Sequence, residues 1–180
     1  MTEFRASTGR PSRDSVNRPH TPKRSTYERA LDMLEARARG VVELRRLLLK
    51  KGEPEADVDA AIERLKTSGL LDDTNFARQL TRSKAVGAGL SRRRIGQELA
   101  KRDVSRDISD NAIEAVFEEE GIDEAESIDR VARKKLRMLT KVDDATRRRR
   151  LYAFLARRGY DSDDITQVLQ TLLAQSDADG

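Results

Sequence analysis

A chain of 180 residues with 38% charged and 37% hydrophobic residues suits small units with thin hydrophobic cores and a very polar surface. The absence of cysteine and the single histidine, His20, exclude disulfide scaffolds, thiolate or multi-histidine metal sites, cysteine nucleophiles and histidine-based triads. Lys and Arg outnumber Asp and Glu by 36 to 32, a net charge of +4 that is compatible with a polyanionic partner without requiring one.

The first 25 residues are rich in Ser, Thr, Pro, Arg and Asn and have almost no bulky apolar side chains. Such a segment cannot bury enough surface to offset the entropy of ordering it, so residues 1–25 are predicted to be a disordered basic tail. It lacks the apolar region of a secretory signal, and no later stretch approaches the roughly 18 apolar residues of a membrane span. We therefore expect a cytoplasmic protein without a membrane partner.

From Tyr27 to about Gln175 nearly every segment carries apolar residues at spacings of three and four. No run is rich enough in Val, Ile and Thr to indicate a strand, so the fold class is predicted to be all-α. Three of the predicted helices, each opening one structural unit, cover about residues 27–38, 74–86 and 123–141.

A threefold repeat becomes visible when Leu48, Leu99 and Leu155 are superimposed. Each follows an apolar residue by four positions and so shares its helix face; these residues are Leu44, Ile95 and Leu151. Four positions after each Leu comes a residue that can end a helix in left-handed geometry: Gly52, Asp103 and Gly159. Two residues further on, a proline or a capping side chain can start the next helix: Pro54, Ser105 and Asp161.

The pattern predicts three tandem three-helix repeats, each too small to bury its own apolar face and therefore stacked on its neighbour. The result is an elongated array whose curvature the pattern leaves open. The expected bounds are 26–72, 73–121 and 122–176, followed by a short tail at 177–180. Gly87-Ala88-Gly89 and Gly121 are expected to be flexible joints within and after the second repeat.

The segment Gly-Leu-Leu-Asp-Asp-Thr-Asn-Phe-Ala-Arg at 69–78 resembles the most specific motif of the RecX family, a G-[LY]-[LI]-[DN]-D-x-x-[FY]-A stretch that joins its first two repeats. Around it, ALDMLEARARGVVELRRLLLKKG, GLSRRRIGQELAKRDVS and LYAFLARRGYDSDDI look like the three repeat cores of the family in order, so the resemblance spans about residues 27–175. Two departures concern helix caps. Gly40 stands where the family often has Ser, and Arg102-Asp103-Val104 replaces K-G-[IV].

The resemblance implies a regulatory protein that lies along the groove of the RecA–DNA filament and inhibits RecA ATP hydrolysis and strand exchange. It thereby implies a role in recombination and DNA repair, with RecA as partner and no catalytic activity. We expect a monomer without a cofactor or a metal. The alternative is a DNA-binding helical-repeat protein that acts without RecA. An enzyme is disfavoured because no catalytic set of residues is recognisable.

A basic stripe follows from the spacing i, i+3, i+4, i+7 and i+11 along the predicted helix 123–141. Its members are Arg130, Arg133, Lys134, Arg137 and Lys141. The other side of this helix is expected to present Ile128, Val131, Met138 and Leu139. No acidic residue lies between Val131 and Val142, which favours an anionic partner. The alternative is a solvated helix face.

Two arginine clusters fall in the opening turns of predicted middle helices. They are Arg92, Arg93 and Arg94, and Arg147, Arg148, Arg149 and Arg150. A cation there opposes the helix dipole by about 0.3–1 kcal/mol, so helix stability does not explain these clusters. Free N–H groups and guanidinium forks suit DNA phosphates or an acidic RecA surface. The alternative is intrahelical pairing of Arg94 with Glu98, or of Asp144 with Arg148.

The remaining candidate motifs favour structural roles. Asp72 and Asp73 precede a helix without metal ligands or an acid-base partner nearby, so we expect helix caps rather than paired catalytic carboxylates. Gly87-x-Gly89 follows no strand and precedes no Lys-Ser/Thr, which argues against a nucleotide loop. Single aromatics on different helices are expected to pack in the core rather than stack on bases: Phe76, Phe117, Tyr152 and Phe154.

Overall fold

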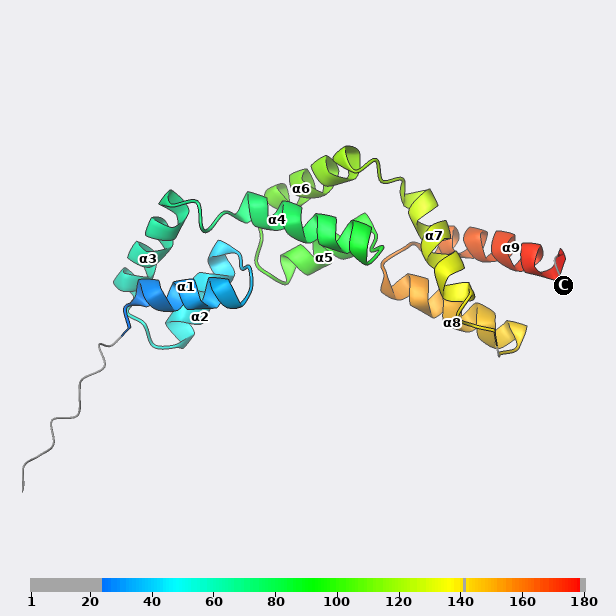
Figure 1. The fold of residues 1–180 in the computed structure, drawn as a ribbon, viewed down its shortest axis with the longest axis horizontal. Coiled ribbons are helices and arrows are strands. Elements are labelled where there is room, and N and C mark those ends of the chain that lie inside the picture. Colours follow the sequence, from blue (N-terminus) through cyan, green and yellow to red (C-terminus); the bar gives the residue numbers. More distant parts are fainter. Residues whose placement is uncertain (1–23, 141, 179–180) are drawn as a thin grey trace, which may run out of the picture.

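The described part of the chain is entirely helical apart from turns and loops, which confirms the predicted fold class. The computed structural model describes residues 24–140 and 142–178, and within these ranges it contains nine α-helices, one π-helical turn and no strand. The helices follow one another in three groups of three along an elongated, arched row (Figure 1). Residues 1–23, which make up most of the predicted tail, lie outside the described ranges.

The first unit contains α1 (Thr26–Ala36), α2 (Val41–Lys50) and α3 (Glu55–Thr67). Ser25 starts α1 with a capping box, because its hydroxyl accepts a hydrogen bond from the Glu28 N–H and the Glu28 carboxylate accepts one from the Ser25 N–H. The apolar stripes of the three helices meet in one core, made of Ala30, Leu44, Leu48, Val58, Ile62, Leu65 and Leu71.

The second unit contains α4 (Asp73–Arg82), its π-helical continuation η1 (Ser83–Gly87), α5 (Arg92–Ala100) and α6 (Arg106–Glu119). Asp103 ends α5 with a φ of 59°, so it takes the left-handed position predicted for it. The core of this unit is made of Phe76, Ala77, Ala85, Ile95, Leu99, Val104, Ala112, Ile113 and Phe117.

The third unit contains α7 (Glu124–Leu136), α8 (Asp144–Arg157) and α9 (Ser162–Ala178). The expected helix 123–141 is too long, because α7 ends at Leu136 and the chain turns so that Leu139 enters the core. Conversely, α9 continues to Ala178, beyond the expected start of the tail at 177, since no Gly or Pro interrupts it. The core is made of Ile128, Ala132, Leu139, Leu151, Leu155, Tyr160, Ile165, Leu169 and Leu172.

The expectation that the units stack their apolar faces on one another is wrong for the described residues. Each unit closes a core of its own, and the extensively packed helix pairs all lie within one unit. Leu48, Leu99 and Leu155 are fully buried in the three separate cores, as predicted equivalents should be. The contacts between neighbouring units include a hydrogen bond from the Val41 N–H to Asp73 and the packing of Val131 on Gly89.

Contacts with the third unit hold Ala88 and Gly89 in place, which argues against the flexible joint expected at Gly87-Ala88-Gly89. The Ser91 N–H donates to the Arg158 carbonyl oxygen at 3.0 Å, and Arg158 Nε donates to the Ala88 carbonyl oxygen at 3.2 Å. Gly89 is buried at φ +59°, where a Cβ atom would collide with Val131. Glycine is needed here for close packing rather than for motion.

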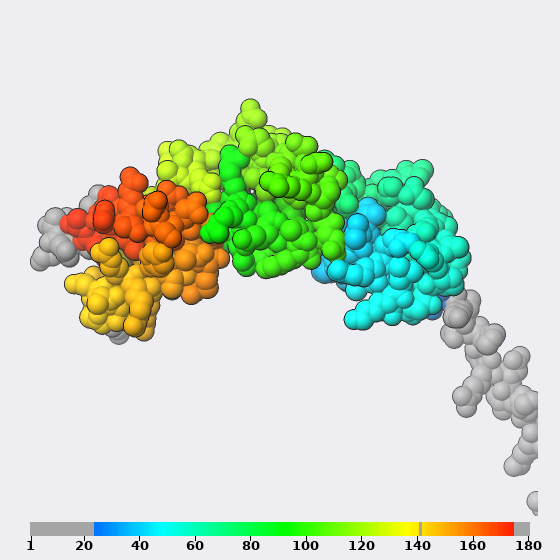
Figure 2. Space-filling view, turned by 180° about the vertical axis from the view of Figure 1, so that it is seen from behind, coloured from blue at the N-terminus to red at the C-terminus, as the bar shows by residue number. Residues whose placement is uncertain are grey.

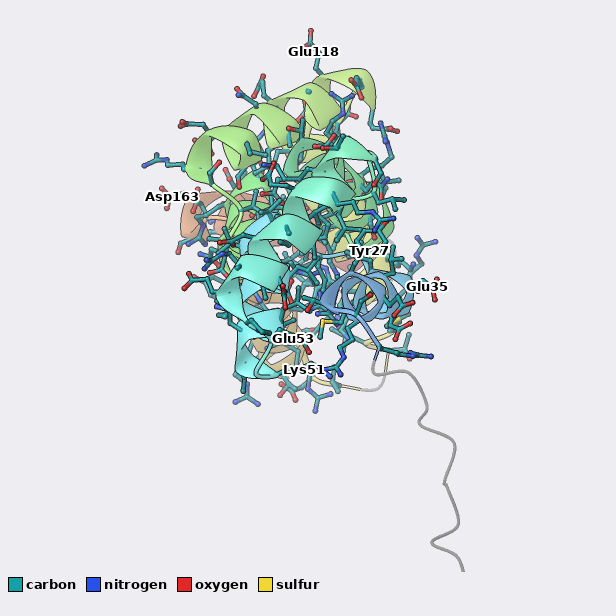
Figure 3. The ribbon with its side chains drawn as sticks, turned by 90° about the vertical axis from the view of Figure 1, so that its left-hand side faces the viewer. Tyr27, Glu35, Lys51, Glu53, Glu118 and Asp163 are labelled. Carbon is teal, nitrogen blue, oxygen red and sulfur yellow. The ribbon has the colours of Figure 1, made fainter. Side chains whose placement is uncertain are left out.

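The arch has a convex and a concave side. The space-filling view from behind shows the three units in contact along the same bent row (Figure 2). Seen along its long axis, Glu118 of the second unit projects on the convex side, whereas Lys51 of the first unit lies towards the opposite side (Figure 3). A single chain therefore offers a long surface built from three units, each with its own core.

Candidate binding surface

Arg92 is committed to contacts within the protein. Ser91 caps α5, and the Arg92 N–H at the start of this helix donates to Glu124 of α7 at 3.0 Å. The Arg92 guanidinium pairs with Glu114 at 2.7 Å and lies 4.2 Å from the centre of the Phe117 ring. Carboxylates from two other helices therefore compensate the cation that the helix dipole disfavours.

The other two arginines of this cluster also have internal partners. Arg93 Nε donates to the Gly159 carbonyl oxygen at 3.1 Å, which ties α5 to the loop between α8 and α9. Arg94 pairs with Glu98 at 2.9 Å, the intrahelical pair weighed as the alternative. The structure thus places this cluster beside the junction of the second and third units, where Arg92 and Arg93 bind groups of the third unit and Arg94 pairs within α5.

The second arginine cluster is more open. Arg147 pairs with Asp144 at 2.7 Å, so Asp144 takes Arg147 as its partner instead of the expected Arg148. Within the described ranges Arg148, Arg149 and Arg150 are exposed and form no ion pair. They lie in the second turn of α8, one turn beyond the cap at Asp143, so the helix dipole opposes them less than was expected.

Asp143 provides the negative charge at the start of α8. Its carboxylate accepts a hydrogen bond from the Thr146 N–H at 2.9 Å. This bond is the main reason why the pKa of Asp143 lies below its ordinary value, and the nearby Arg149 charge adds to the effect. The cap therefore stays ionised beside three arginines.

The predicted basic stripe is shorter than expected, because α7 ends before Arg137. Arg133 pairs with Asp129 at 2.7 Å, and Arg130 donates to the Ser127 hydroxyl oxygen at 3.3 Å. Lys134 and Arg137 are exposed and have no ion pair in the described part of the chain, whereas Lys141 lies outside it. Arg133 and Lys134 occupy the last turn of α7, where the helix dipole favours cations.

The apolar side expected for this stripe is only partly buried. Ile128 and Leu139 enter the core, and Val131 is half-buried against it. Met138 follows the end of α7 and is 66% exposed, so it is not a core residue. Met138 therefore belongs to the surface that contains Lys134.

Two further cations of this surface were not predicted from the sequence. Arg158 lies 3.7 Å and Lys135 lies 5.3 Å from the centre of the Phe154 ring. Both interactions are cation–π contacts, which replace a carboxylate partner. The spacing of four between Phe154 and Arg158 places both on one helix face and could have indicated their contact from the sequence. The contact of Lys135 with Phe154 joins two different helices, so the sequence contains no such signal for it.

The described acidic side chains form no metal-binding group, and two of them cap helices. No group of three or more His, Cys, Asp or Glu side chains in residues 24–140 and 142–178 is arranged to hold a metal ion. Asp72 accepts hydrogen bonds from the Thr74 and Asn75 N–H groups, and Asp73 accepts one from the Val41 N–H, which confirms both as helix caps. None of the described helices is both long and apolar enough to cross a bilayer.

Comparison with known proteins identifies each unit separately. Models of the first, second and third three-helix domains of RecX match residues 27–65, 72–113 and 122–169. "Regulatory protein RecX" of Mycobacterium avium (strain 104) is 37% identical over 156 residues, which cover 85% of this chain and 88% of the relative. The protein of the same name from Mycobacterium ulcerans (strain Agy99) is 36% identical over 155 residues, with the same coverage.

The fold is also found in a solved structure. The crystal structure of RecX from Lactobacillus salivarius superimposes with a TM-score of 0.63 and covers 82% of this chain and 94% of that chain. The sequence identity in this comparison is 20%, so the similarity shows a shared fold.

Proposed function

Because the chain belongs to the RecX family, we propose that it binds the RecA–DNA filament and inhibits RecA ATP hydrolysis and strand exchange. The observation that carries this proposal is the match of all three RecX domains, in order, to one chain whose relatives are named regulatory proteins. In this proposal the protein acts in the cytoplasm as a monomer, modulates recombination and DNA repair, and catalyses no reaction itself.

The elongated shape supports binding to a filament. Three units in an arched row present a long surface, whereas a compact protein of the same length would touch only a small part of a groove (Figure 1). Each unit has its own core, and hydrogen bonds across the junction of the second and third units fix how these two units are oriented. The row therefore offers one long, preformed surface to a filament groove.

The exposed cations of the third unit are the contacts that we propose for the anionic partner. Lys134, Arg148, Arg149 and Arg150 have no ion pair among the described side chains, so binding a carboxylate or phosphate breaks no internal contact. Arg92, Arg93 and Arg94, in contrast, have internal partners. We therefore propose that the third unit contributes more to recognition than the start of α5.

A second candidate function is DNA binding without RecA. The run of Arg148, Arg149 and Arg150 supports it, since exposed arginines are suited to neutralising phosphates in a sequence-independent way. Both candidates use the same cations but differ in whether RecA is required.

Co-sedimentation separates the two candidates. The protein is incubated with RecA filaments on single-stranded DNA, or with the same DNA alone, at two salt concentrations. We expect strong retention only with RecA, together with a dose-dependent decrease in RecA ATP hydrolysis. Equal retention with and without RecA would favour the DNA-binding candidate, and retention without a change in ATP hydrolysis would refute the inhibitory role.

A further inference from the structure

A hollow of about 310 Å³ lies between the second and third units. The segment 86–89 forms one wall, and α7 and α8 form the others. Four large apolar side chains line it, namely Val86, Val131, Met138 and Phe154. Val86 is 49% exposed and Met138 is 66% exposed, so two of the large apolar side chains that face solvent meet at one place. Exposed apolar side chains gathered in a hollow are typical of a binding site.

The rim of this hollow is positively charged. Its cations are Arg130, Lys134, Lys135 and Arg158, and no acidic residue is among the lining side chains. None of these four forms an ion pair with a carboxylate in the described ranges. Arg130 donates to a serine hydroxyl instead, and Lys135 and Arg158 lie over the Phe154 ring. The hollow therefore combines apolar surface with positive charge that the protein does not neutralise.

Arg158 is the most confined of these cations. Its Nε donates to the Ala88 carbonyl oxygen, and its guanidinium lies against Phe154. Burial lowers the pKa of Arg158 below its ordinary value, although the group stays charged at neutral pH. A partly desolvated cation gains more from an incoming anion than a fully hydrated one does.

Contacts between the second and third units hold the wall of the hollow in place. The Tyr160 hydroxyl donates to the Gly89 carbonyl oxygen at 3.1 Å, and Gly89 packs directly on Val131. A preformed hollow loses little entropy on binding, which favours even a short ligand.

The side chains favour a polypeptide over a nucleic acid. Arg158 and Lys135 lie over the Phe154 ring, where a base would have to stack. A phosphate backbone would use the cations but has no group that covers Val86 and Met138. An acidic peptide with one large apolar side chain satisfies both kinds of surface.

We propose that this hollow binds an acidic polypeptide segment, which inserts one large apolar side chain between Val86 and Met138. Flanking carboxylates of the segment pair with Lys134 and Arg130. The inference describes the chemistry of the segment that the junction of the second and third units recognises. It rests on the proposed function only for the identity of the protein that carries this segment.

Fluorescence anisotropy with labelled peptides tests this site in the full chain. The probe has a leucine between two pairs of glutamates in a Gly/Ser background. One control peptide has glycine in place of leucine, and another has glutamine in place of glutamate. We expect the chain to bind the probe at least about tenfold more tightly than either control, because the glycine peptide lacks the buried apolar side chain and the glutamine peptide lacks the charge-assisted hydrogen bonds.

Four substitutions locate the site. Met138→Ser and Lys134→Glu should each weaken probe binding about tenfold. Val42→Ser removes another half-exposed apolar side chain, and Arg106→Glu reverses another exposed cation; both lie in other parts of the chain and should leave binding unchanged. Circular dichroism checks that all four variants stay helical.

Three results would overturn the proposal. The first two are no binding of the probe and equal binding of the glycine peptide. The third is binding of labelled oligothymidine in place of the probe, weakened in the same way by Met138→Ser and Lys134→Glu. Co-sedimentation with RecA filaments separates this site from the proposed function. A chain that binds the probe but not the filament refutes the proposed function alone. A chain retained by the filament that ignores the probe refutes the hollow.

Discussion

The Asp73 carboxylate, at the start of α4, accepts a hydrogen bond at 2.8 Å from the Val41 N–H, the first backbone donor of α2. The second unit thus caps a helix of the first. Gly40 offers no side-chain cap of its own, and a Cβ atom there would lie 3.0 Å from the Asp73 carboxylate oxygen. The Asp-Asp pair therefore has two roles, since Asp72 caps its own helix and Asp73 caps the neighbouring one.

Removal of this cap should destabilise the protein and loosen the junction between the first two units. Asp73→Ala is expected to lower the free energy of unfolding by about 0.5–2 kcal/mol, the usual cost of a lost N-cap. Urea denaturation measures the change, and Thr74→Ala at an exposed neighbouring position serves as the control. Gly40→Ser should restore much of the loss in the Asp73→Ala background, because the new hydroxyl can cap α2. An unchanged unfolding midpoint in Asp73→Ala would show that water replaces the carboxylate.

Truncation of a core leucine should affect mainly one unit. Leu99→Ala is expected to cost about 2–5 kcal/mol, as large-to-small substitutions in cores do. Because Leu99 lies in the core of the second unit alone, hydrogen exchange should accelerate in α4, α5 and α6 more than elsewhere. A cost below about 0.5 kcal/mol, or equal acceleration in all three units, would contradict the separate cores.

Charge reversal in the second turn of α8 should weaken inhibition of RecA without unfolding the protein. Arg148→Glu together with Arg149→Glu removes cations that form no ion pair in the described structure, so thermal stability should change little. Retention on RecA filaments and inhibition of ATP hydrolysis should both fall. Lys50→Glu together with Arg106→Glu is the matched reversal of two exposed cations in the other units, and we expect it to inhibit like the wild type. Equal inhibition by both double variants would mean that Arg148 and Arg149 are only solvated surface residues.

Salt dependence shows whether DNA phosphates share this interface. If they do, each lost phosphate contact should flatten the plot of log affinity against log salt by roughly one unit. The slope is compared between the wild type and the α8 double variant on RecA–DNA filaments. An unchanged slope with weaker binding would assign these arginines to RecA carboxylates instead.

Tyr160 should make the junction of the second and third units sensitive to high pH. Burial raises the pKa of this phenol above its ordinary value near 10, although its hydrogen bond with Ser127 acts in the opposite direction. The neutral phenol therefore stabilises the folded state below about pH 10. That contribution is lost as the pH rises through the folded pKa.

The comparison with Tyr160→Phe isolates this effect from the titration of lysines. Urea midpoints measured between about pH 8 and pH 11 should fall more steeply for the wild type than for the variant. At the lower pH the variant should be the less stable protein, because the Gly89 carbonyl oxygen loses its donor. Parallel curves would show that the phenol does not contribute to the pH dependence.

The helices and their grouping in threes could be predicted from the sequence because they depend on neighbouring residues. Apolar side chains three and four positions apart define the buried face of a helix, and Leu48, Leu99 and Leu155 are all fully buried. Gly52 and Asp103 end their helices in the left-handed conformation, which is a local property of each residue.

The partners of the charged residues could not be predicted, because they depend on which helices the tertiary structure brings together. From the sequence, Arg92 is expected to be a free cation at the start of a helix. In the structure, α6 and α7 bring Glu114 and Glu124 to it. Similarly, α7 ends at Leu136 and Leu139 turns into the core of the third unit, a contact that the helical spacing does not encode. Periodicity therefore determined which side of each helix is buried, whereas long-range packing decided which cations remain exposed to bind a partner.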